Sequence, residues 1–172
     1  MRLARATLEA HLGARPVPAL PEATGAALQR GAFVSITAHG ALRGCIGHMA
    51  DDRPLGDVVR EMTVAAARDD PRFAPVAPEE LPGLALEISV LTPLIPLRPT
   101  PVDPRHIVVG RDGLVVRRGR HVGLLLPQVA TEYHWGPEAF LAAACRKAGL
   151  PPDAWREPDT EVLTFQADVF GE

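Results

Sequence analysis

The sequence predicts an α+β fold with a mainly antiparallel sheet and packed helices. Segments with helical periodicity and segments with strand alternation follow one another irregularly along the 172 residues. Short turn sequences around Gly40 and Gly119 separate neighbouring strand segments, which favours hairpins over repeated βαβ units. A chain of this length can bury a core without disulfides or metals.

The first part of the chain predicts two short helices and one long one. Residues 2–12 are amphipathic, residues 13–21 hold three prolines and form a connector, and residues 22–30 suggest another short helix. The clearest helix covers 54–68, where apolar residues recur at i, i+3, i+4 and i+7. It ends before Asp69-Asp70-Pro71, because the residue before a proline avoids helical backbone angles.

A hairpin lies between these helices, with strands at 32–39 and 42–47. A three-residue loop, Ala38-His39-Gly40, would end in a G1 bulge at Gly40. This register pairs Ile36 with Leu42 and Val34 with Gly44. One face would then pack on the core and the other would be more polar. The core face carries Val34, Ile36, Leu42 and Ile46, and the other face carries Ser35, Thr37, Arg43 and Cys45.

The second part of the chain is richer in strands. Residues 84–92 alternate strongly, and residues 93–105 contain five prolines and should be loop or sheet edge. A helix over 137–148 begins with a proline and ends at Gly149. The remaining expected strands cover 107–109, 114–117, 122–126 and 161–170.

Composition argues against several classes of protein. The formal net charge is −3, and the short basic cluster of Arg117, Arg118 and Arg120 reads as a solvated hairpin end, so no nucleic-acid partner is expected. Charges interrupt every apolar run near the N-terminus, and no stretch approaches the ~18 apolar residues of a membrane span. We expect a cytoplasmic protein with no membrane partner and with both cysteines reduced.

Cys45 is the main candidate for chemistry. It lies between Gly44 and Gly47, and glycines let a substrate or another backbone approach closely. Arg43 would share its face of the strand and favour the thiolate, which is the nucleophilic form. The alternative is a buried cysteine that acts as a small hydrophobic residue, as Cys145 on the last helix is expected to do.

Other polar residues are weaker candidates. His48 could be a base for Cys45 or a loop histidine without a role, and no second ligand pair accompanies it, so no metal is expected. Asp70 and Arg72 could line a cleft or form a local ion pair after the helix, and Glu87 could be a general acid or base or face solvent. The catalytic candidates are Cys45, Arg43, Glu87 and Asp70, and the substrate-binding candidates are Gly44, Gly47, His48 and Arg72.

Several motifs together resemble the AMMECR domain family. They are LRGCIG after FVSI, AARDDPRFAPV at 66–76, LEISVLTP before the proline-rich loop, VVGRDGLVV at 108–116, LLLPQVATE at 124–132 and CRKAGL at 145–150. The resemblance covers almost the whole chain as one domain, 1–172. It implies an α+β fold with a larger subdomain that holds both termini and a smaller subdomain. Bacterial and archaeal members are similar to protein A of the AmmeMemoRadiSam system, which implies a radical-SAM protein and a Memo-like protein as partners.

The resemblance also implies that the LRGCIG cysteine, here Cys45, is a candidate site together with Arg43 and Gly44. The chain departs from the family at Asp112, where members often have histidine before Gly-Leu. Two functions remain open, with no cofactor expected in either. One is an enzyme that uses Cys45 on a small molecule or a partner protein. The other is a binding or adaptor module without chemistry of its own.

Overall fold

The computed structural model describes residues 1–20 and 24–172 and divides the chain into two compact units. The first unit consists of Met1–Leu91 and Asp168–Glu172, and therefore contains both ends of the chain. The second unit is Thr92–Ala167. Each unit has its own antiparallel sheet, helices and apolar core, so the predicted α+β class is confirmed.

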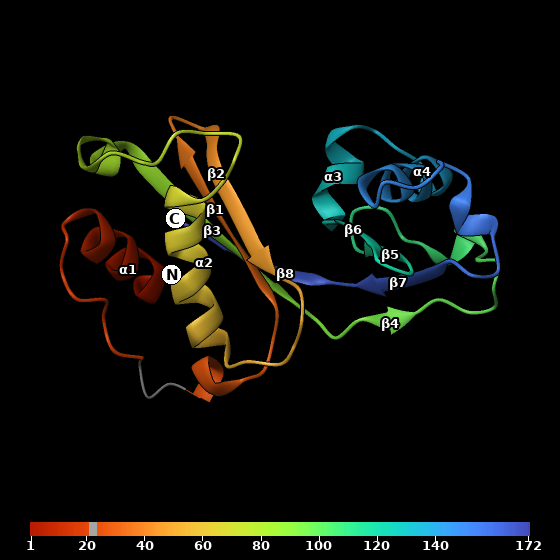
Figure 1. The fold of residues 1–172 in the computed structure, drawn as a ribbon, viewed down its shortest axis with the longest axis horizontal. Coiled ribbons are helices and arrows are strands. Elements are labelled where there is room, and N and C mark those ends of the chain that lie inside the picture. The colour runs from red at the N-terminus through yellow and green to blue at the C-terminus, as the bar shows by residue number, and fades with distance from the viewer. Residues whose placement is uncertain (21–23) are drawn as a thin grey trace. The chain divides into compact units, whose positions relative to one another are not determined.

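The first unit is a four-stranded sheet with helices on one face (Figure 1). The strand order is β2-β1-β3-β8, with β1 paired antiparallel to both β2 and β3. Helix α2 packs on β1 and β2, and α1 packs on α2. The bounds are α1 Arg2–Leu12, β1 Ala32–Ala38, β2 Ala41–His48, α2 Leu55–Arg68, β3 Leu84–Leu91 and β8 Ala167–Gly171. The helices predicted over 2–12 and 54–68 are therefore confirmed.

Gly44 sets how closely α2 approaches the sheet. It faces the helix from β2 and pairs with the core residue Ile36 on β1. A Cβ atom at this position would lie 2.1 Å from the carbonyl oxygen of Ala66, which is helix backbone and cannot rotate away. The absence of a side chain therefore lets backbone pack directly on backbone.

The hairpin register differs from the one that the sequence predicts. The turn has two residues, His39 and Gly40, both at positive φ, and Ala38 pairs with Ala41. Backbone of this kind matches the twist of a two-residue hairpin, so the bulge is not needed at the turn. It lies further along, where Ile36 pairs with Gly44 and Thr37 with Leu42, leaving Arg43 as the extra residue.

The bulge moves Leu42 to the other face, where it is 43% exposed. The prediction that Leu42 belongs to the core face is therefore wrong, whereas Val34 and Ile36 are buried as expected. Cys45 lies opposite Ser35. Of the helix predicted over 22–30, the structure shows a 3₁₀ turn at Thr24–Ala27, and residues 22 and 23 lie outside the described residues.

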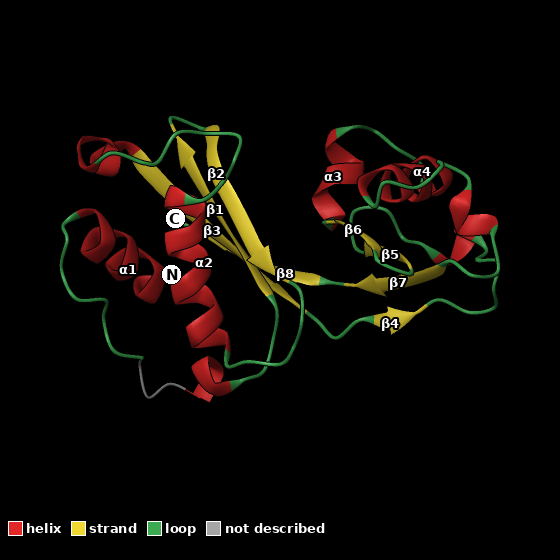
Figure 2. Ribbon diagram, viewed as in Figure 1, coloured by secondary structure: helices red, strands yellow, loops and turns green. Residues whose placement is uncertain are grey.

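The second unit has strand order β4-β7-β5-β6 and two helices (Figure 2). Helix α4 packs on β5 and β6, and α3 packs on β5. The core contains Leu114, Val116, Phe140, Leu141 and Trp155. The bounds are β4 Ile95–Pro96, β5 Gly113–Arg118, β6 His121–Leu125, α3 Pro127–Glu132, α4 Pro137–Lys147 and β7 Glu161–Phe165.

The second unit differs from the prediction in three places. Residues 107–109 belong to no strand, and the sequence did not predict helix α3. The single strand expected over 161–170 is two strands in different sheets, β7 and β8. The break falls at Gln166, whose backbone exchanges two hydrogen bonds with Thr92: Thr92 N–H donates to the Gln166 carbonyl (2.8 Å) and Gln166 N–H donates to Thr92 Oγ1 (2.8 Å).

The close approach of α2 to β2 predicts the effect of Gly44→Ala. The added methyl group must displace the helix, so the free energy of unfolding should fall by about 3 kcal/mol. Urea unfolding followed by circular dichroism measures this. Gly171→Ala on β8 is the matched control, because a Cβ there meets nothing within 4 Å. Equal midpoints for the two variants would contradict the packing described.

Candidate functional site

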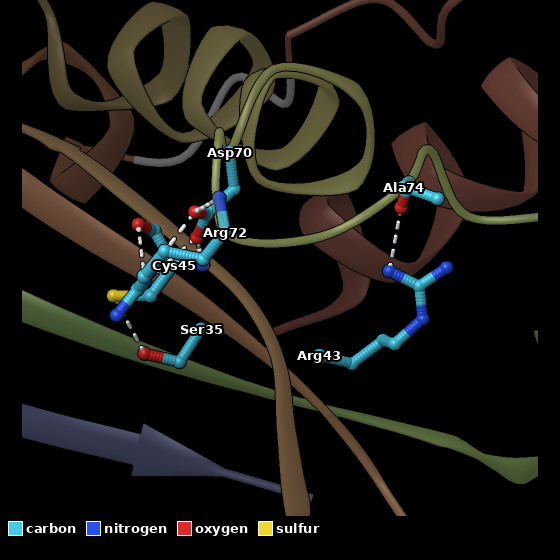
Figure 3. Close-up of polar contacts among 6 residues, drawn as sticks. All are labelled: Ser35, Arg43, Cys45, Asp70, Arg72 and Ala74. Carbon is cyan, nitrogen blue, oxygen red and sulfur yellow. Dashed lines mark hydrogen bonds and ion pairs between the residues drawn. The ribbon is translucent and has the colours of Figure 1, made fainter.

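The Cys45 thiol lies on the face of the first sheet that α2 does not cover. Strand β2 is at the end of the sheet, and Cys45 pairs with Ser35 on β1. Ser35 Oγ donates a hydrogen bond to Cys45 Sγ at 3.2 Å (Figure 3). The thiol is half-buried, so a reagent can reach it, in contrast to Cys145, which is fully buried.

Asp70 holds the main chain of Cys45 from the loop that follows α2. Its side chain is 2% exposed, and its Oδ2 accepts a hydrogen bond from Cys45 N–H at 2.8 Å. Arg72 binds the same carboxylate through Nε to Oδ1 (2.9 Å) and Nη2 to Oδ2 (2.7 Å). Arg72 N–H also donates to Oδ1 at 3.1 Å. Four donors therefore surround this buried carboxylate (Figure 3).

These contacts fix the charge of Asp70. The hydrogen bonds from the Arg72 guanidinium hold the pKa of Asp70 well below its usual range, and the backbone N–H groups of Cys45 and Arg72 add to this against the opposing effect of burial. Both oxygens are occupied, so Asp70 positions its neighbours and is a poor proton acceptor. These contacts position the Cys45 main chain and Arg72, and the catalytic role predicted for Asp70 stays a prediction.

Arg72 keeps part of its guanidinium free. Its side chain is 55% exposed, and Nη2 also lies 3.4 Å from the Cys45 carbonyl oxygen. Within residues 1–20 and 24–172, Nη1 has no hydrogen-bond partner. The hydrogen bonds to Asp70 raise the pKa of Arg72, so the guanidinium is a persistent cation near the thiol.

Arg43 does not lie beside the thiol, and the prediction that it shares the face of Cys45 is wrong. The bulge turns its side chain towards the 74–80 segment (Figure 3). Its Nε and Nη2 bind Glu80 at 2.8 and 2.9 Å, and its Nη1 donates to the Ala74 carbonyl at 2.8 Å. Arg43 therefore anchors the loop after α2 and cannot promote the thiolate directly.

Cys45, Ser35 and Glu87 form a row of polar side chains across three neighbouring strands. Ser35 pairs with Cys45 on one side and with Glu87 on the other, so the three side chains lie on one face of adjacent strands. Because neighbouring strands are about 4.8 Å apart, Glu87 lies about 10 Å from Cys45 with Ser35 between them. The sequence pattern placed Ser35 on the same face as Cys45, but Ser35 was not among the predicted site residues. Its pairing with Cys45 across the hairpin is the signal that could have identified it.

The comparisons with known proteins agree on one family. The AMMECR1 family model matches residues 1–170. The chain belongs to the AMMECR1 family. Among relatives of this AMMECR1-family chain, a protein from Methanothermobacter thermautotrophicus is 48% identical over 176 residues, covering 100% of this chain and 92% of the relative. Protein TK0174 of Thermococcus kodakarensis is 46% identical over 180 residues, covering 100% and 88%.

A solved AMMECR1-family structure has the same fold. The crystal structure of the uncharacterized protein PH0010 from Pyrococcus horikoshii matches with a TM-score of 0.93 and 44% sequence identity. The match covers 99% of this chain and 88% of PH0010. The names of these relatives state no activity, so the function must be argued from the site.

Three other predicted residues have packing or local roles in this AMMECR1-family chain. Gly44 faces Ala66, and Gly47 lies under the Phe33 ring, which a Cβ would approach within 2.2 Å. His48 Nε2 lies 2.7 Å from Asp52 Oδ1. Since residues three apart in a strand point to opposite faces, His48 cannot serve Cys45 as a base.

The described part of the chain shows neither a membrane-spanning helix nor a cluster of metal ligands. No helix there is long and apolar enough to cross a membrane. No group of three or more His, Cys, Asp or Glu side chains gathers there as metal ligands would.

The charge of Asp70 predicts a pH-dependent effect of Asp70→Asn. Losing charge-assisted hydrogen bonds at a buried site should lower the free energy of unfolding by about 2 kcal/mol. A carboxylate with a depressed pKa stabilises the fold above the pKa of the unfolded chain and loses this effect as the pH falls towards the folded-state pKa. The deficit should therefore be constant from about pH 8 to about pH 4.5 and shrink below about pH 3.9.

Urea unfolding across this pH range measures the deficit. The control is Asp69→Asn, because Asp69 is exposed and, among the described residues, its carboxylate pairs only with the neighbouring Arg68. This variant should keep the wild-type midpoint at every pH. A deficit for Asp70→Asn that does not change with pH would show that the charge of Asp70 is not what stabilises the site.

Proposed function

We propose that the protein is an enzyme in which Cys45 is the reacting group and Arg72 binds an anionic group of the substrate. The observation that carries this is the shared carboxylate of Asp70, which fixes the Cys45 main chain and the Arg72 guanidinium in one set of hydrogen bonds. A reachable thiol and a cation with a free donor are thereby held at the edge of the same sheet. This pairing is typical of sites that bind and attack charged substrates.

Ser35 and Glu87 supply a route for the thiol proton. The proton of Sγ passes to Ser35 Oγ, whose own proton passes to the Glu87 carboxylate. The Sγ electron pair then forms a bond to an electrophilic carbon, and the leaving group departs with its bonding pair and takes the proton from Glu87. The place of Ser35 between Cys45 and Glu87 supports this order. Ser35 Oγ donates to Cys45 Sγ in the structure, so its hydrogen must first rotate towards Glu87 before the oxygen can accept the thiol proton.

The pathway is proposed from the family. The likeness to protein A of the AmmeMemoRadiSam system suggests that the substrate is a small molecule or a partner protein in a cytoplasmic pathway with a radical-SAM protein and a Memo-like protein. The net charge of −3 favours such partners over nucleic acid.

One observation favours the alternative of a binding or adaptor module. Among the residues that the structure describes, Ser35 is the only side chain hydrogen-bonded to Cys45 Sγ, and both Asp70 oxygens are occupied. A site without a direct base suits docking of a partner as well as slow chemistry. In this case the thiol would be a contact surface.

The enzyme proposal predicts how Cys45 reacts with charged and neutral reagents. Iodoacetate and iodoacetamide alkylate the same sulfur, but the first is an anion that Arg72 should attract. Arg72→Gln should lower the ratio of the two rate constants about fivefold. Glu87→Gln should slow both reagents equally and leave the ratio unchanged. Mass spectrometry of the modified peptide measures the rates.

Controls define the outcome of this experiment. Cys45→Ser must abolish the labelling of the native protein, since Cys145 is buried. Arg68→Gln is the matched control for Arg72, because Arg68 is exposed, carries the same charge and, in the described part of the chain, binds only Asp69. An equal ratio in wild type, Arg72→Gln and Arg68→Gln would refute a role for Arg72 in anion binding.

The adaptor alternative makes a different prediction. If the LRGCIG surface only docks a partner, the thiol is part of the contact, and Cys45→Ala should bind a purified radical-SAM or Memo-like protein of the same organism more weakly than wild type. Isothermal titration calorimetry with each protein measures this. No heat of binding with either protein at low and at high salt would count against the adaptor function and leave the enzyme proposal standing.

A further inference from the structure

The second unit contains a cavity whose lining residues all lie between Thr92 and Gln166 in the sequence. None of the residues that surround Cys45 lines this cavity. It encloses about 440 Å³. This volume falls in the range of pockets that hold small molecules, roughly 300–1,000 Å³. Its walls combine the polar residues Thr92, His106 and Arg111 with the apolar residues Ile95, Leu97 and Phe165.

A buried carboxylate holds one wall of this cavity in place. The Asp112 side chain is 5% exposed and accepts a hydrogen bond from Val108 N–H at 2.8 Å. Arg111 Nε donates to Oδ1 at 2.8 Å, and Nη2 donates to Oδ2 at 3.0 Å. These bonds and one from the Gln166 side chain keep the pKa of Asp112 low despite its burial. Both carboxylate oxygens of Asp112 therefore already accept hydrogen bonds from neighbouring residues.

Arg111 presents a cation to the cavity in the way that Arg72 does beside Cys45. Its hydrogen bonds to Asp112 raise its pKa, so it stays charged. Its side chain is largely exposed, and in the described part of the chain Nη1 has no partner. Asp112 neutralises the charge of Arg111. The guanidinium N–H groups that do not bind Asp112 point away from it, and a carboxylate oxygen of a ligand can accept hydrogen bonds from them.

Two further polar side chains of the cavity, Thr92 and His106, can donate hydrogen bonds; Thr164 and Gln166, which can both donate and accept, also line it. Thr92 Oγ1 accepts from Gln166 N–H at 2.8 Å, which leaves its hydroxyl hydrogen free to donate. The ring of His106 can donate through either nitrogen, depending on its tautomer. Together with the Arg111 guanidinium, these donors can bind an anion.

The remaining wall is apolar and open. Ile95 is 62% exposed on the short edge strand β4, Leu97 is half-buried, and Phe165 lines the same cavity but is only 2% exposed. Exposed apolar surface inside a cavity gains free energy when a ligand covers it. The ligand should therefore carry a hydrocarbon part as well as an anionic end.

We propose that this cavity binds a small carboxylate with an aliphatic chain, with its carboxylate on Arg111 and its chain against Ile95, Leu97 and Phe165. It is a binding site without chemistry, because its residues form no hydrogen-bonded nucleophile and base. It does not depend on Cys45, so it stands or falls separately from the proposed enzyme activity.

An NMR titration of the full ¹⁵N-labelled chain tests the site. The probes are hexanoate, hexanamide and acetate. Hexanoate should shift the amides of Arg111 and Gln166 in a saturable way. Hexanamide, which lacks the charge, and acetate, which lacks the chain, should each bind about tenfold more weakly.

Variants separate the two halves of the site. Arg111→Gln should weaken hexanoate about tenfold. Arg105→Gln is the matched control, because Arg105 forms the same fork with Asp103 but lies outside the cavity. Ile95→Thr, on an exposed edge position that tolerates substitution, should weaken hexanoate and leave acetate unchanged. Arg72→Gln should change none of these shifts.

The result that overturns the proposal is equally specific. Shifts that do not saturate, that map away from Arg111 and Gln166, or that are the same for hexanoate and hexanamide would refute an anion site. Equal affinity of wild type and Ile95→Thr for hexanoate would refute the position of the aliphatic chain.

Discussion

The buried carboxylate of Asp70 is the interaction on which the candidate site depends. Removing a charge from water is costly unless the charge is fully hydrogen-bonded, and here two backbone groups and one guanidinium meet it. Those donors come from β2 and from the loop after α2, which are otherwise separate in sequence. The requirement to satisfy one carboxylate therefore fixes the position of the Cys45 main chain and of Arg72 together.

Most residues of the LRGCIG segment have structural contacts, and these contacts leave the Cys45 thiol accessible. Gly44 admits α2, Gly47 accommodates the Phe33 ring, and Arg43 anchors the loop through Glu80. Each of these contacts is structural, and together they leave the Cys45 thiol on the open face. A motif with several packing constraints around one reachable sulfur is consistent with either proposed function, but in both the sulfur is the group placed for contact.

The same local arrangement occurs in each unit. Asp70 with Arg72 and Asp112 with Arg111 both combine a buried carboxylate, a backbone N–H donor and a bidentate arginine whose Nη1 has no partner among the described residues. The backbone donor comes from the distant strand β2 for Asp70 and from the preceding loop for Asp112. The carboxylate orients the guanidinium, which loses less conformational freedom when it then meets an anion. The neighbours differ: a thiol and a hydroxyl in the first unit, and an apolar wall in the second. This difference is why we assign chemistry to one and binding to the other.

Local pattern determined much of this protein. The apolar pattern of residues 2–12 and 54–68 predicted two long helices, and the terminal signals Pro137 and Gly149 predicted the third. Alternation predicted β1 and β3. Each of these signals depends on neighbours a few residues apart. The features that were predicted wrongly depend on residues that are distant in the sequence. The bulge that turns Arg43 is fixed by Glu80 and by the approach of α2, and the break between β7 and β8 is fixed by Thr92. The sequence by itself determined that Cys45 lies on a strand among glycines; only the tertiary structure decided that Ser35, Asp70 and Arg72 are its neighbours, because hydrogen bonds between distant segments leave no periodic trace in the chain.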